Sequence, residues 1–299
     1  MSRTQFRLLR CQSAINRVQG MPFRWSLNPY RGCAHACQYC YARVTHAYFN
    51  LNLGRDFEEQ IFVKTNLAAV LRDELNRPSW RHESIAIGTA TDPYQPAEGT
   101  FRITRQCLQV LAEIANPCSV TTKGTLIVRD IDVMQQLARD TRFEVHLSLI
   151  TLDRDLWRRL EPGAPSPASR LRALERLRSA GVPVSVFLMP IVPGLTDRPE
   201  RLAEVVRAAA EHGAQAVWSS SLRLAPGVKE WFFDFLRRDF PHLVPSYERG
   251  YAGSREAPAL YRQKVADRVD AAKADVVLTP ACATPTLTRI GRQYCLPVP

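Results

Sequence analysis

The sequence predicts an α/β protein, a partial (β/α)6 barrel followed by a helical C-terminal extension. Three observations predict this class. Short apolar runs alternate with amphipathic segments about six times up to residue 222, as parallel strands and their covering helices do. A chain of 299 residues with 45% hydrophobic residues can bury the core that a barrel needs. Polar residues also follow several predicted strands, which is where a barrel carries its chemistry.

The elements can be justified in chain order. Residues 1–24 are polar and basic without a clear period, so we expect an N-terminal lead-in on the outside of the fold. Helices are expected at residues 41–50, 66–76, 104–115, 131–138, 169–180 and 198–211, where helical periodicity is accompanied by an Asn N-cap or a following glycine. Buried strands are expected at residues 84–88, 118–122, 143–150, 182–189 and 215–222, and residues 60–64 form one more short apolar run. Residues 25–222 therefore make up the predicted core barrel.

The last part of the chain differs in composition. Residues 223–299 begin with an aromatic helix around Trp231, continue with a charged helix over residues 255–272, and end in a Pro-rich tail. We expect this extension to cap the barrel. Together with the positive charge of the chain, the aromatic helix suggests a cleft for a flipped-out or single-stranded base.

Charge and composition limit the compartments and partners that this protein can have. The net charge of +11 comes mostly from Arg spread along helical stretches, which permits a polyanionic partner without requiring one. No apolar run reaches the roughly 20 residues that a membrane helix needs. Eight cysteines without a secretory leader favour a reducing compartment, where clustered cysteines bind metals or catalyse reactions. We therefore expect a cytoplasmic protein without a membrane partner, and a nucleic acid is one candidate substrate.

Cys33, Cys37 and Cys40 carry the strongest chemical signal. Three and then two residues separate them, and no fourth cysteine completes the set. Four thiolates would close an iron-sulfur cube or a structural zinc site, whereas three leave one iron open to an outside chelate. Two alternatives stay open: structural zinc, completed by His35 or His46 in a nucleic-acid-binding protein, and a cluster-carrying redox protein without radical chemistry.

The residues around the triplet resemble a known family. Residues 28–41, with an aromatic residue before the last cysteine, are similar to the cluster motif of the radical S-adenosylmethionine (SAM) superfamily. Further stretches resemble its spore photoproduct lyase-like branch, often labelled DNA-repair-photolyase-like. They are residues 88–98, 121–123, 129–130, 161–162, 170–171 and 190–197, so the resemblance runs from about residue 25 to about residue 240. Only the cysteine motif is specific for the chemistry.

The resemblance implies a barrel of the radical SAM type and an enzyme. It implies that Cys33, Cys37 and Cys40 hold three irons of a 4Fe-4S cluster and that SAM chelates the fourth iron through its amino and carboxylate groups. A reducing donor of the flavodoxin or ferredoxin type would supply an electron. Cleavage of SAM would then release a 5′-deoxyadenosyl radical that abstracts hydrogen from an unassigned substrate, in a lyase-like or modifying reaction.

The same resemblance implies contacts to SAM. Tyr39 and Tyr41 would form apolar walls near the adenine, although Tyr41 is explained equally well as an ordinary barrel aromatic. Many members hold the SAM amino group with a Gly-Gly-Glu stretch, which this chain lacks, and Thr91 and Asp92 stand there instead. An Asp accepts from an ammonium as a Glu does. The alternative role of Thr91 and Asp92 is a turn before Pro93.

Two further positions complete the implied cofactor site. Lys123 would pair with the methionine carboxylate, and Ser148 would bond the ribose or the methionine end unless its hydroxyl is satisfied at the strand end. Glu161 and Arg170 either contact substrate or form a structural ion pair, and we expect the ion pair.

One departure concerns the reaction. The lesion lyase of this branch returns a hydrogen atom from a cysteine, and Thr89 stands at the matching position here. A hydroxyl holds its hydrogen too strongly to replace a thiol, so we do not expect spore photoproduct lyase activity. Cys107 and Cys118 are expected in the core. Cys282 and Cys295 could ligate an auxiliary cluster or remain free thiols.

Overall fold

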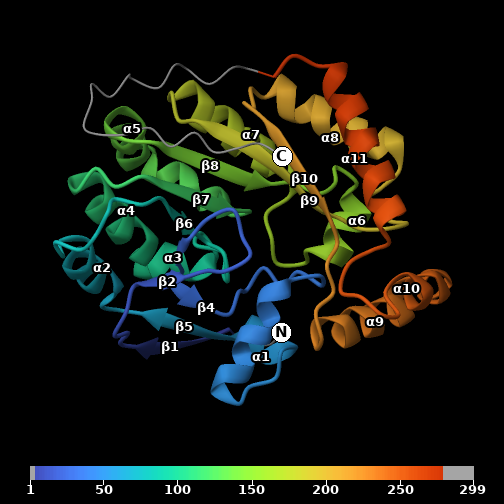
Figure 1. Ribbon diagram of the computed structural model, residues 1–299, viewed down its shortest axis with the longest axis horizontal. Helices are drawn as coiled ribbons and strands as arrows, with labels where there is room; N and C mark the ends of the chain where they lie inside the picture. Colours follow the sequence, from blue (N-terminus) through green and yellow to red (C-terminus); the bar gives the residue numbers. More distant parts are fainter. Residues whose placement is uncertain (1–3, 279–299) are drawn as a thin grey trace.

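Six parallel strands form one curved sheet in the computed structural model, which describes residues 4–278 (Figure 1). The strand order is β10-β9-β8-β7-β6-β3, and β2 joins the β3 edge in antiparallel orientation. The strands are β2 (Ile15–Arg17), β3 (Trp25–Leu27), β6 (Ile85–Ile87), β7 (Cys118–Thr122), β8 (Phe143–Ser148), β9 (Val184–Ile191) and β10 (Val217–Ser221). The predicted α/β partial barrel is confirmed.

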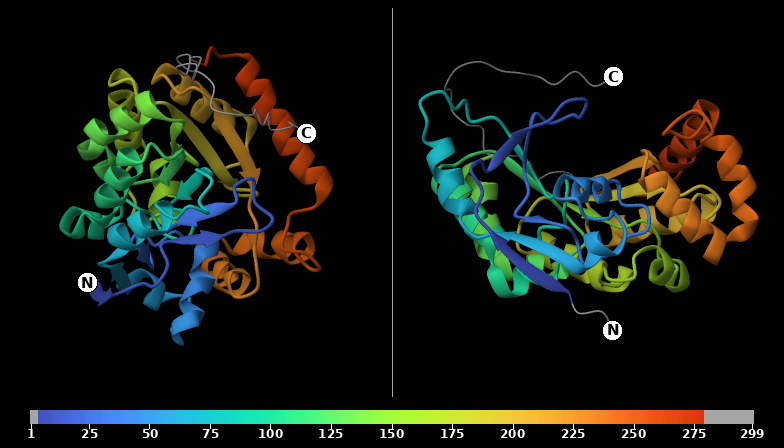
Figure 2. Two further views of the ribbon diagram at one scale, coloured as in Figure 1. Left: turned by 60° about the vertical axis from the view of Figure 1, so that its left-hand side comes forward. Right: turned by 90° about the horizontal axis from the view of Figure 1, so that it is seen from below.

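Helices connect the strands and cover the outer face of the sheet (Figures 1 and 2). The barrel helices are α2 (Leu67–Leu75), α4 (Ile103–Glu113), α5 (Ile131–Asp140), α6 (Arg154–Leu160), α7 (Pro167–Ser179) and α8 (Pro199–Glu211). Shorter helices lie in the connections: η1 (Tyr41–Phe49) and η2 (Thr125–Asp130), both of 3-10 type, and α1 (Arg55–Glu59) and α3 (Pro96–Phe101). The C-terminal part holds α9 (Val228–Asp239), η3 (Pro241–Leu243), α10 (Val244–Gly250) and α11 (Ala259–Ala274). Within the described part of the chain, none of the helices has the length and apolar character that crossing a membrane requires.

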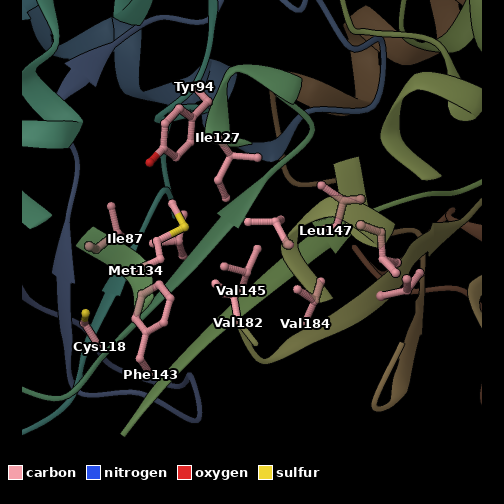
Figure 3. Packing of buried hydrophobic residues seen from close by; sticks show 14 of the residues in the cluster. Ile87, Tyr94, Cys118, Ile127, Met134, Phe143, Val145, Leu147, Val182 and Val184 are labelled. Carbon is pink, nitrogen blue, oxygen red and sulfur yellow. The ribbon is translucent and has the colours of Figure 1, made fainter. Parts of the chain in front are cut away.

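The main hydrophobic core lies between the sheet and these helices. Side chains alternate along each strand, so Ile87, Val145 and Val184 point outward into the helix layer, where they are fully buried (Figure 3). The residues between them face the concave inner side of the sheet, which is more polar and includes Glu144 and Ser185. The alternation therefore leaves a polar inner surface for chemistry.

The N-terminal lead-in contains strands that the sequence pattern did not predict. β1 (Gln5–Leu9) pairs in parallel with β5 (Gln60–Lys64), and β4 (Tyr30–Arg31) pairs with the other side of β5. These three strands form a separate small sheet, so the apolar run at residues 60–64 is not a barrel strand. Most of β1 is exposed, and it therefore lacks the buried apolar pattern by which a strand is recognised.

The aromatic helix α9 is part of a second core cluster. Phe232, Phe233 and Phe235 are buried there together with Tyr39 of the cysteine loop. Trp231 packs over the guanidinium of Arg43 at 4.5 Å from the ring centroid. The expectation that α9 shapes a cleft for a base is wrong, because its rings are used to bury the cysteine loop.

Candidate active site

The cysteine loop, residues 32–40, leads from β4 to η1. Cys33 and Cys37 are buried and Cys40 is half-buried. Amide groups within the loop turn it tightly: Ala36 N donates to Cys33 O and Cys40 N donates to Cys37 O, both at 3.3 Å. Gly32 has a φ of +79°, and a Cβ there would lie 2.9 Å from two backbone carbonyl oxygens, so this entry to the loop requires glycine.

Two of the three thiols, Cys33 and Cys37, are buried, and the charges of the three cysteines act on one another. The pKa of Cys37 is raised to about 12, chiefly by burial; the charge of Lys123 lowers it, and the charges of Glu161 and Cys40 contribute to the rise. Burial also raises the pKa of Cys33 well above its ordinary value, with added repulsion from Asp92 and the other two cysteines. Thiolates gathered in such a place need a cationic metal group to offset their charge, so the donor set fits an iron-sulfur cluster.

The histidines near the loop already have other contacts. His35 Nδ1 lies 3.1 Å from Asp92 Oδ2, and His46 Nε2 lies 3.1 Å from the carbonyl oxygen of Gln60. Across residues 4–278, no group of three or more His, Cys, Asp or Glu side chains is arranged around one point as ligands of a single metal ion. A cluster places each thiolate on a different iron and does not require such convergence.

Gln95 ties the cysteine loop to the loop after β6. Its Nε2 donates to the carbonyl oxygen of Gly32 at 3.0 Å, and its Oε1 accepts from the amide of Ala34 at 3.0 Å, on the two sides of Cys33. Thr91 Oγ1 donates to the same Gly32 carbonyl at 2.6 Å. Gln95 is fully buried. In this structure Thr91 therefore contacts the cysteine loop backbone and orients it.

Asp92 joins three segments at the carboxyl ends of the strands. Its carboxylate accepts from Tyr94 N at 2.9 Å, Thr122 Oγ1 at 2.5 Å and Lys123 N at 2.7 Å, and it faces His35. Burial would raise the pKa of Asp92, but the charge of His35 and these hydrogen bonds hold it well below its usual range. The bond to Tyr94 N forms the turn around Pro93, so Asp92 bonds chiefly within the protein.

A buried polar cluster forms behind the cysteine loop. Arg170 and Glu161 make an ion pair at 2.5 Å with at most 1% of either side chain exposed, and the hydroxyl of Tyr39 donates to Glu161. Lys123 Nζ lies 3.9 Å from Glu161 Oε1 and 5.7 Å from the centroid of the Tyr39 ring. Burial would lower the pKa of Lys123, but nearby negative charges, Glu161 among them, raise it. The expected Glu161–Arg170 pair is present, and Lys123 is a cation next to it.

Ser148 and Tyr41 are placed differently. Ser148 ends β8, and its buried Oγ has no hydrogen-bond partner among the described residues. A buried hydroxyl without a partner costs about 1–3 kcal/mol, so a ligand that bonds to it is favoured. Tyr41 is 56% exposed, and its hydroxyl donates to the carbonyl oxygen of Thr89. Tyr41 therefore lies at the mouth of the barrel and outside its core.

Two residues that the sequence analysis did not select hold the cysteine loop. Arg43 is fully buried, and its Nε and Nη2 donate to the carbonyl oxygen of Cys37 at 3.1 and 2.9 Å. Gly163 N donates to His35 O at 3.1 Å, and a Cβ at Gly163 would lie 2.1 Å from Ala34 O. A basic residue just after the triplet was a readable signal for Arg43. The contact of Gly163 joins segments that are far apart in the sequence, so no local sequence pattern predicts it.

A parallel partial barrel with a cysteine loop at the carboxyl ends of its strands defines a barrel enzyme with its chemistry at that end. Residues 27–209 match the family model of the Radical SAM superfamily. The chain therefore belongs to the radical SAM superfamily and is an enzyme, as the resemblance implied. Membership supports chemistry in which SAM is cleaved to start a radical reaction.

The chain is also similar to curated proteins and to solved structures. The chain is 42% identical over 262 residues to an uncharacterized protein of Mycobacterium tuberculosis, covering 87% of this chain and 77% of the relative. It is 28% identical over 186 residues to the radical SAM Nalpha-GlyT isomerase of Pseudomonas phage M6, covering 59% of this chain and 36% of that enzyme. A mutant of spore photoproduct lyase with bound AdoMet and dinucleoside spore photoproduct is similar in structure, with a TM-score of 0.67, 14% identity, and coverage of 90% of this chain and 78% of that one. At this identity, the likeness concerns the fold.

Proposed function

We propose that Cys33, Cys37 and Cys40 bind a 4Fe-4S cluster at which this enzyme reductively cleaves SAM. The observation that carries the proposal is the cysteine triplet, with two buried thiols, whose neighbouring histidines each contact another residue: His35 contacts Asp92 and His46 contacts Gln60. When bound, the cluster would supply an electron and SAM a cleavable sulfonium, which together would provide the chemistry for hydrogen abstraction from a substrate.

Chain residues would bind SAM from the carboxyl ends of β7 and β8. Lys123 supplies a positive charge for the methionine carboxylate, and its place beside Glu161 keeps it protonated. The free hydroxyl of Ser148 offers a hydrogen bond to the ribose or methionine end. Tyr39 and Tyr41 flank the last cysteine and provide ring surface near the adenine.

Thr91 and Asp92 would serve mainly as positioning residues. Both bond to the cysteine loop or to the residues around it, and these contacts orient the thiolates. A direct contact between Asp92 and the SAM amino group stays a prediction. Arg43, which pairs with Glu58 at 2.5 Å, donates to the Cys37 carbonyl and would hold the loop in place around the cluster.

The proposal also includes a cellular compartment, an electron donor and a class of substrate. We propose a cytoplasmic enzyme that receives electrons from a flavodoxin- or ferredoxin-type donor. The net charge of +11 supports a polyanionic substrate, and a nucleic acid is the candidate. Thr89 stands in place of the hydrogen-returning cysteine of the lesion lyase, which supports a reaction other than spore photoproduct reversal.

The test compares two cysteine substitutions after anaerobic reconstitution with iron and sulfide. Cys37→Ala removes one thiolate of the triplet, and Cys11→Ala is the matched control because Cys11 lies outside it. We expect wild type and Cys11→Ala to bind iron and sulfide, to show visible absorption, and to form 5′-deoxyadenosine from SAM with a chemical reductant. Cys37→Ala should form none.

Two results would contradict the proposal. Formation of 5′-deoxyadenosine by Cys37→Ala at the wild-type rate would exclude the triplet as the cluster site. Colourless wild-type protein that retains stoichiometric zinc after iron-replete anaerobic expression would support the alternative, a nucleic-acid-binding protein with structural zinc.

A further inference from the structure

Three side chains form one row across the inner face of the sheet. Ser148 of β8 is paired in register with Phe187 of β9, and Phe187 is paired with Trp218 of β10. Neighbouring strands lie about 4.8 Å apart, so the row extends about 10 Å from Ser148 to β10, the last strand of the sheet. The proposed cofactor residue Ser148 is therefore the inner end of a row that ends in two aromatic rings.

The ring at the outer end of this row is open to solvent. Trp218 is 55% exposed, although the residue before it, Val217, is buried against the helices. Alternation along β10 therefore turns Trp218 to the inner face. More than half of this large ring stays in contact with solvent on the concave side, and contact with a ligand would bury that apolar surface.

The rest of the row is held rigidly. The ring of Phe187 stacks on His146 with centroids 4.2 Å apart and planes at 11°. His146 Nε2 lies 3.4 Å from Glu144 Oε2, and the hydroxyl of Ser185 donates to the other oxygen of Glu144. These polar contacts fix His146, and His146 fixes Phe187. The aromatic surface is thus preorganised, which reduces the entropy that a stacked ligand would cost.

We propose that Trp218 and Phe187 form an aromatic platform that stacks a base of a single-stranded nucleic acid substrate. This inference rests on the proposed function, because the platform continues the row that begins at Ser148. A base is planar and presents a π-face to any ring, and stacking on aromatic side chains tolerates every base. The net charge of +11 complements the phosphates that accompany the base.

This platform lies at a different place from α9, where the sequence had suggested base binding. The rings of α9 are buried in the second core cluster, whereas the platform lies on the inner face of the sheet. In this arrangement the substrate would lie across the inner face of the sheet, from β10 toward the end of β8. The hydrogen that is abstracted would then belong to the stacked nucleotide or its neighbour.

The test measures binding to reconstituted protein without reductant, so that no turnover occurs. The probes are a fluorescently labelled single-stranded oligodeoxynucleotide of mixed sequence and an abasic strand of equal length. Trp218→Ala should weaken binding of the oligonucleotide by about 5- to 150-fold, which corresponds to about 1–3 kcal/mol for stacking of one base. Trp218→Phe should restore most of the affinity. Leu260→Ala, at another exposed apolar residue, 69% exposed on α11, is the matched control and should bind as wild type does.

Intrinsic fluorescence gives a second readout that a purely structural effect would not produce. A base stacked on the exposed Trp218 should quench the emission of wild type, and Trp218→Phe should lose this quenching while it still binds. The abasic strand should bind more weakly than the oligonucleotide to wild type and equally to wild type and Trp218→Ala.

Several outcomes would overturn the platform. Equal affinity of wild type for the two strands would show that charge alone binds them, and unchanged oligonucleotide affinity in Trp218→Ala would exclude stacking. An aromatic peptide that binds through Trp218 where the oligonucleotide does not would also exclude a base as the occupant. Because binding is measured without turnover, loss of SAM cleavage with intact binding would contradict the proposed function and leave the platform standing.

Discussion

Replacing Glu161 with a neutral residue should show how much of the protein's stability depends on the charge balance of the polar cluster behind the cysteine loop. The Glu161–Arg170 pair is at most 1% exposed, and Arg170 also donates to the carbonyl oxygens of Ser148 and Pro165 at 3.1 and 2.9 Å. Glu161→Gln keeps the shape but leaves the guanidinium buried without its counter-charge. Removing one partner of such a pair costs about 3–5 kcal/mol, so we expect the free energy of unfolding to fall by about that amount.

The second variant tests whether the effect belongs to the pair. Arg170→Met leaves Glu161 with Lys123 at 3.9 Å and with the Tyr39 hydroxyl, and it frees two backbone acceptors. We expect a loss of about 3 kcal/mol or more. The double variant Glu161→Gln with Arg170→Met should lose less stability than the sum of the two single losses. Each substitution alone leaves a buried charge without its partner, whereas the double variant removes both charges.

The assay is urea unfolding of the metal-free protein under reducing conditions, followed by circular dichroism. Asp234→Asn is the control, since the Asp234–Arg237 pair on α9 is 74% and 57% exposed and should contribute about 1 kcal/mol or less. A loss of stability in Glu161→Gln no larger than that in Asp234→Asn would contradict a buried charge pair, and so would losses of the two single variants that simply add in the double variant.

Two further predictions concern a close contact and a buried charge. Gly163→Ala places a Cβ 2.1 Å from the carbonyl oxygen of Ala34, so the cysteine loop must move, and reconstitution should yield less iron per chain than in Gly253→Ala, where no atom lies within 4 Å. Equal iron content in the two variants would contradict this. Burial lowers the pKa of Lys64 from 10.5 to about 8, so the unfolded chain binds more protons between these values and the stability contributed by this group rises with pH there. Lys64→Met should therefore be more stable than wild type at pH 7, by about 3 kcal/mol, and this difference in stability should shrink between pH 8 and 10.5. A difference that stays constant over this pH range would contradict the prediction.

Much of the barrel was readable from the sequence because its signals are local. β7 was predicted with its observed bounds, and the other predicted barrel strands and helices were found within a few residues. Two strands were missed for different reasons: β1 is largely exposed, and β3 is only three residues long. The burial of α9 was also missed, since an aromatic helix can face a core or a ligand and only its neighbours decide which. Cys282 and Cys295 lie outside the described residues, so the auxiliary-cluster expectation stays a prediction.

The sequence by itself determined the family and the three candidate cluster ligands, because the type and the spacing of these ligands are contained in eight consecutive residues of one loop. It also indicated where the barrel carries polar residues, since each follows its own strand. Only the tertiary structure decided what those residues touch. Thr91 and Asp92 bond to the cysteine loop and its surroundings, Lys123 lies beside Glu161, and Ser148 keeps a free hydroxyl. Such pairings depend on distances between segments far apart in the chain, and packing sets those distances.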